Sequence, residues 1–97
     1  MKTVIASHVT KDATHYMKRG NQKMAKILMQ LGATRAWLDH TSQQREQLGA
    51  ACRQMLLAGC CKTHVDAHYK REIETMNIEL DAFVARSWEE FSAKEAA

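Results

Sequence analysis

Apolar residues recur with a helical period over the first third of the chain. One stripe has three-, four- and seven-residue spacings and consists of Met17, Met24, Ile27, Leu28 and Leu31. Such spacing places the side chains along one side of a helix. We expect this helix to be capped by Thr10 or Asp12, to bend or make a close contact at Gly20, and to stop at Gly32.

A second apolar pattern follows a polar run that resembles a helix start. Thr41 with Gln44 three residues later fits a capping box, in which the side chains satisfy free backbone N–H groups. The apolar side of this expected helix consists of Leu48, Cys52, Met55, Leu56 and Gly59. We expect the helix to weaken over the stretch from Gly59 to Thr63.

The last third of the chain has the clearest periodicity. Its apolar residues alternate four- and three-residue spacings and are Tyr69, Ile73, Met76, Leu80 and Phe83, continued by Val84, Trp88 and Phe91. This pattern predicts a long amphipathic helix from about His64 almost to the end, coiled-coil-like over about two heptads. We expect it to be the longest helix.

Composition supports an all-α fold. Proline is absent and there are four glycines in 97 residues, so little interrupts a helix. We predict one helical domain over residues 1–97, with about three principal helices. Val4, Ile5 and Val9 lack a helical period and predict a short N-terminal strand or arm. Because so short a chain buries a modest core, we also expect a helical dimer.

The net charge of +3 is unevenly distributed. Between Lys11 and Arg35 there are six basic residues and one acid, whereas from Glu72 onward there are seven acids and two basic residues. Such an asymmetry can steer a partner, although it also fits contact between the two ends or head-to-tail pairing.

The odd number of cysteines, three, argues against a secreted disulfide framework. No stretch is long enough to span a membrane, so we expect a cytoplasmic protein without membrane contact.

The acidic part of the last helix is the candidate protein-binding surface. Acids stand beside apolar residues there, and aromatic side chains dominate binding hot spots. The candidate residues are Ile78, Glu79, Asp81, Trp88, Glu89, Glu90 and Phe91. The sequence has no motif of a catalytic nucleophile, phosphate loop or dinucleotide site. We therefore expect a non-catalytic regulator or adaptor without a cofactor, in one form an antagonist that covers the nucleic-acid-binding surface of a repressor or nuclease.

The alternative function is a dimeric DNA-binding regulator. The string Leu31-Gly32-Ala33-Thr34-Arg35 resembles the turn of helix-turn-helix proteins, which place the N-terminal residues of the second helix on base edges. The resemblance implies that Thr34 and Arg35 read bases while Lys23 and Lys26 contact phosphates. It departs from the pattern at Leu28, where a small residue is usual.

A metal site is a weaker candidate. Cys60, His64 and His68 are spaced by four residues and have side chains that zinc favours. Three successive positions along one helix fit one tetrahedron poorly, and a fourth ligand would be needed. We expect folding without a metal ion, with the cysteines as small buried apolar residues.

Overall fold

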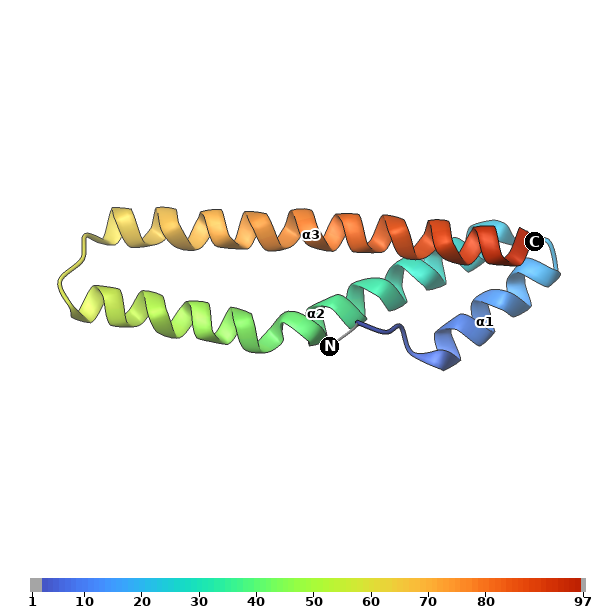
Figure 1. Ribbon diagram of the computed structural model, residues 1–97, viewed down its shortest axis with the longest axis horizontal. Coiled ribbons are helices and arrows are strands. Elements are labelled where there is room, and N and C mark those ends of the chain that lie inside the picture. Colours follow the sequence, from blue (N-terminus) through green and yellow to red (C-terminus); the bar gives the residue numbers. More distant parts are fainter. Residues whose placement is uncertain (1–2, 97) are drawn as a thin grey trace. The chain divides into compact units, whose positions relative to one another are not determined.

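The computed structural model describes residues 3–96 and is all-helical, as predicted (Figure 1). Three helices follow one another: α1 (Ser7–Lys18), α2 (Gln22–Leu57) and α3 (Lys62–Ala96). No described residue lies in a strand, so the N-terminal strand expected over the first residues is not formed by residues 3–10, and Met1 and Lys2 lie outside the described part. The longest helix is α2 with 36 residues, one more than α3, which corrects the expected order of lengths.

Two glycines with positive φ end the first two helices. Gly20 has φ 77° and Gly59 has φ 92°, a region that glycine enters without a steric penalty. At each end two backbone N–H groups turn back to the last turn of the helix: Gly20 to Met17 and Asn21 to Tyr16, then Gly59 to Leu56 and Cys60 to Met55. This is the Schellman arrangement of a helix C-terminus. The first predicted helix is therefore divided at Gly20, and the predicted weak stretch after Gly59 is the loop before α3.

Gly32 does not stop a helix, which corrects the boundary predicted there. It lies inside α2, and a Cβ atom built on it would come within 2.7 Å of Cγ1 of Val9. The missing side chain therefore lets the start of α1 approach α2. Thr41, the predicted cap of a second helix, also lies inside α2, where it is buried.

The described chain divides into two compact units, residues 3–40 with 80–96 and residues 41–79. The first unit contains α1, the beginning of α2 and the end of α3. Its core is made by Ala13, Ala25, Met29 and Phe91, with Ile5, Tyr16, Met17, Leu28 and Trp88 packed against them. Trp37 stacks on Phe83 with ring centroids 5.1 Å apart. These contacts join the three helical segments of the unit.

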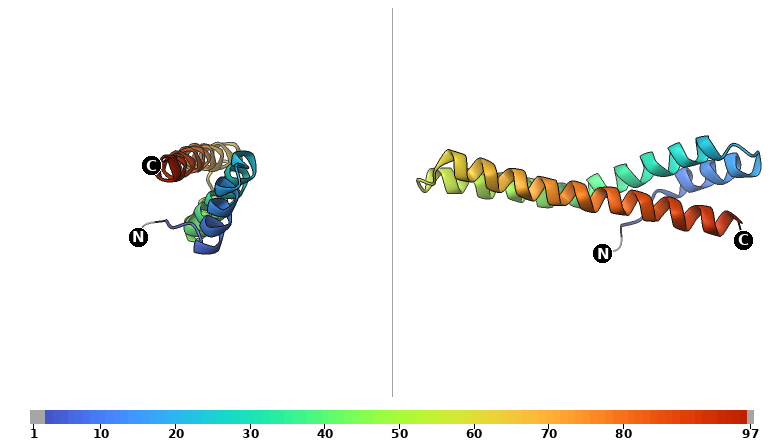
Figure 2. Two further views of the ribbon diagram at one scale, coloured as in Figure 1. Left: turned by 90° about the vertical axis from the view of Figure 1, so that its right-hand side faces the viewer. Right: turned by 90° about the horizontal axis from the view of Figure 1, so that it is seen from above.

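The second unit is a hairpin made by the end of α2 and the beginning of α3, with the chain reversing direction after Leu57 (Figure 2). Only three of its residues are buried: Thr41, Cys52 and Val65. Ile73 and Met76 are half-buried, whereas Tyr69, the first residue of the predicted stripe, is 45% exposed. No large side chain among the described residues is fully buried. The core of this chain is therefore thin.

Candidate protein-binding surfaces

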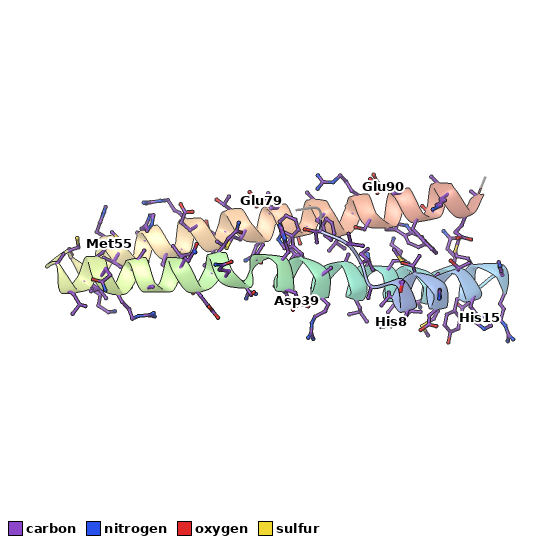
Figure 3. The ribbon with its side chains drawn as sticks, turned by 60° about the horizontal axis from the view of Figure 1, so that its bottom comes forward. His8, His15, Asp39, Met55, Glu79 and Glu90 are labelled. Atoms are coloured by element: carbon purple, nitrogen blue, oxygen red, sulfur yellow. The ribbon has the colours of Figure 1, made fainter. Side chains whose placement is uncertain are left out.

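Most of the predicted protein-binding residues lie on the surface of α3. Ile78 is 70% exposed, which is a large exposure for an isoleucine, and Glu79, Asp81, Glu89 and Glu90 are exposed as well. Figure 3 labels Glu79 and Glu90 on α3. No ion pair within residues 3–96 involves these four acids. These acids are therefore exposed without a direct ion pair, although Arg86 and Lys94 lie within one helical turn of Glu90.

The two aromatic members of the predicted set belong to the core of the first unit. Phe91 is 7% exposed and is one of the four buried core residues. Trp88 is half-buried against that core, 5.9 Å from Phe91 between ring centroids. Phe91 is thus not available as a surface anchor. The sequence pattern did not predict this burial, because the apolar positions shift gradually around the helix and so do not show which side packs inward.

The residues predicted to bind DNA lie along one uninterrupted helix. The turn expected at Gly32 is not formed, because α2 continues through it. Thr34 donates a hydrogen bond to the Gln30 carbonyl oxygen at 2.8 Å, and Arg35 pairs with Asp39 at 3.1 Å. The Lys26 ammonium lies 5.9 Å from the centroid of the Trp88 ring. The side chains remain near the surface, but the second recognition helix that the resemblance implies is absent.

Four apolar residues of α2 are exposed on one side of that helix. They are Met24, Ile27, Leu31 and Leu38, with exposed fractions of 37%, 41%, 64% and 38%. The first three belong to the apolar stripe predicted from the sequence, of which Met17 and Leu28 pack against the core. The core side of this part of α2 consists instead of Ala25, Met29 and Ala33 at four-residue spacing. Those two alanines, eight residues apart on the same side of the helix, were the available signal, because small side chains allow another segment to approach the helix closely.

The cysteines and histidines around the hairpin loop do not form a metal shell. No group of three or more His, Cys, Asp or Glu side chains in the described part of the chain is arranged to hold a metal ion. Cys60 and Cys61 are exposed, which corrects the expectation that both are buried, while Cys52 is buried. Backbone N–H groups of His64 and Thr63 hydrogen-bond the Cys61 thiol and lower its pKa.

A shallow groove opens in the first unit between its N-terminal residues and α3. It has a volume of about 430 Å³, with Met29, Phe83 and Phe91 among its apolar lining and Glu90 and Lys94 among its polar lining. The phenyl rings that line it also pack the unit, so the groove adjoins the core. Its charged side chains come from one helix edge.

No protein-family model, curated protein or solved structure matches this chain. None of the described helices combines the length and the apolar character that crossing a membrane requires.

Proposed function

We propose that this protein is a small, non-catalytic cytoplasmic regulator or adaptor that binds and modulates another protein through the acidic part of α3. The observation that carries the proposal is the exposed Ile78, 70% accessible, within a run of exposed acids. Glu74 precedes it by four residues and Asp81 follows it by three, so both lie beside it on the helix. An apolar residue surrounded by charges of one sign fits a partner with a basic, partly apolar surface.

Electrostatics supports a partner of opposite charge. Glu79, Asp81, Glu89 and Glu90 lack ion pairs within residues 3–96, so their field reaches solvent and would speed the approach of a cationic surface. Basic surfaces that bind nucleic acids meet this description. A specific form of the proposal is therefore an antagonist that covers the nucleic-acid-binding surface of a repressor or nuclease.

The proposal includes a dimer. Support comes from the thin core: seven hydrophobic residues are buried in the described part of the chain, and none of the large ones fully. Association would cover some of the exposed apolar side chains. Light scattering at micromolar concentration should give twice the mass of the chain, and a monomer mass would contradict this part of the proposal.

The binding experiment compares the natural chain with a variant in which Glu79, Asp81, Glu89 and Glu90 are changed to lysine. We expect the natural chain to recover a stoichiometric partner from its host and the variant to lose it. A matched control is Glu46→Lys, which reverses an exposed charge on α2. Equal recovery by all three proteins would refute the proposal.

DNA binding is the alternative that the same samples test. Lys23 and Arg35 are exposed, although Arg35 is paired with Asp39 and α2 has no turn at Gly32. Retention on duplex DNA that falls steeply with salt and is reduced by Arg35→Ala would favour this alternative.

A further inference from the structure

The α2 stripe, defined as Met24, Ile27, Leu31 and Leu38, has the spacing of a helix-pairing seam. Its members follow one another at three, four and seven residues, which are the first and fourth positions of successive heptads. Leu31, near its middle, is 64% exposed. Single exposed leucines are common on proteins, but these four apolar side chains share one side of the helix, with Thr34 at the fourth position between Leu31 and Leu38.

The core of the first unit leaves this row uncovered. Met29 and Ala33 are 3% and 0% exposed and face the other segments of the unit. Leu31 is two residues from each, and two residues correspond to roughly 200° around an α-helix. The α2 stripe therefore lies on the side of the helix opposite its buried face.

The surroundings of the stripe are basic. Over the part of α2 that carries the stripe, residues 22–38, the charged side chains are the three exposed cations Lys23, Lys26 and Arg35. Lys23 and Arg35 lie next to the stripe in the heptad, and Arg35 is partly neutralised by its pair with Asp39. An apolar row with cationic edges is complementary to an apolar row with anionic edges.

We infer that the α2 stripe binds an acidic amphipathic helix of another protein. The heptad row supplies the apolar seam into which such a helix packs, and the cations beside it select acidic flanks. Phosphate contacts of nucleic acid require the cations but not an exposed Leu31. The inference stands on a different surface from the acidic part of α3, so the two are tested separately. Together they describe an adaptor with two binding surfaces of opposite charge.

The test uses a fluorescent synthetic helical peptide with leucine at the first and fourth positions of each heptad and glutamate at the flanking positions. We expect the full chain to bind this peptide, with an affinity that falls as salt increases. A peptide with lysine at the flanking positions should bind at least tenfold more weakly, because its charges repel those of the chain. Equal binding of the two peptides would overturn the inference.

Variants locate the binding site. Leu31→Ser and, separately, Ile27→Ser should each weaken binding about tenfold, the loss expected for one apolar contact. Leu57→Ser is the matched control, because Leu57 is 81% exposed and belongs to the second unit. Circular-dichroism melting curves of all three variants should match that of the natural chain. Unchanged peptide binding by both stripe variants would overturn the inference.

Two further outcomes identify a different occupant. If sedimentation shows that the chain alone forms a dimer that Leu31→Ser dissociates, a second copy covers the stripe and the inference fails. If duplex DNA binds with an affinity that is insensitive to Leu31 and displaces the peptide, the cations alone account for binding and the inference also fails. If both surfaces act independently, the variant with the four α3 acids changed to lysine should lose its partner but still bind the peptide as tightly as the natural chain.

Discussion

Gly32 in α2 lies so close to Val9 in α1 that a methyl group on it would approach Cγ1 of Val9 to 2.7 Å. The Val9 side chain of α1 therefore packs directly against the α2 backbone at a residue without a side chain. The same residue type also ends helices, and at Gly20 and Gly59 it does so through positive φ. The two roles of glycine make different predictions for substitution.

Gly32→Ala should destabilise the first unit although alanine favours helix. Overpacking costs about 1–3 kcal/mol, whereas the gain in helix propensity is about 1 kcal/mol. Gly49→Ala is the internal control, because its Cβ would meet only Arg53 Nη1, at 3.5 Å, within the same helix. That variant should gain up to about 1 kcal/mol. Urea unfolding monitored by circular dichroism measures both, and a stabilised Gly32→Ala would show that the α1–α2 contact is looser than described.

Phe91 and Ile78 should respond in opposite ways to truncation. Phe91→Ala removes a buried ring and should cost about 3–5 kcal/mol of unfolding free energy. Ile78→Ala should change stability by less than about 0.5 kcal/mol, because the side chain is 70% exposed, and should weaken partner binding. Denaturation of both variants followed by a partner-binding measurement separates core from surface. A large loss of stability for Ile78→Ala would mean that this residue is covered.

Sequence periodicity predicts the helical content, the number of helices and the loop after Gly59. It fails at positions where tertiary contacts give a residue a role that differs from its usual one. Gly32 carries the usual signal of a helix end, yet α2 continues through it and the Val9 side chain lies against it. Met24 and Leu31 carry the signal of a core stripe, yet the alanines beside them face the core. Local patterns do not contain the position of α1, and that position decides both cases.

At a pH below the ordinary thiol pKa, Cys61 should be the most reactive of the three cysteine thiols. Backbone N–H groups of His64 and Thr63 stabilise its thiolate and lower the pKa, whereas Cys60 is exposed and Cys52 is buried. Timed alkylation with iodoacetamide near neutral pH, followed by peptide mass spectrometry, should modify Cys61 first and Cys52 last. In urea the difference between Cys60 and Cys61 should disappear, and its persistence there would show that folding does not cause it.

The same hydrogen bonds to Cys61 make the folding stability depend on pH. A thiol whose pKa is lower in the folded chain binds fewer protons when folded than when unfolded over the range between its two pKa values. The stabilisation that these hydrogen bonds give to the folded chain is therefore present at a pH above the pKa that the Cys61 thiol has when unfolded. It is lost as the pH falls through the lower pKa that this thiol has in the folded chain. Cys61→Ser should remove this part of the pH dependence, while Cys60→Ser should retain it. Identical pH profiles for the two variants would contradict the assignment.

The acidic residues of α3 should act mainly on the rate of association with the proposed partner. Reversing Glu79, Asp81, Glu89 and Glu90 to lysine should slow association strongly and abolish or invert its salt dependence, because long-range attraction acts before contact. Ile78→Ala should instead speed dissociation, since short-range apolar contact is lost only after the partner has docked. Surface plasmon resonance at several salt concentrations separates the two rates.

Trp88→Ala provides the contrasting case, because Trp88 packs against the core of the first unit and beside Lys26, so its effect should follow the loss of folded protein. If Trp88→Ala leaves the melting curve unchanged but speeds dissociation, the tryptophan is part of the binding surface. If the charge-reversal variant associates at the natural rate, α3 is not the element that the partner recognises.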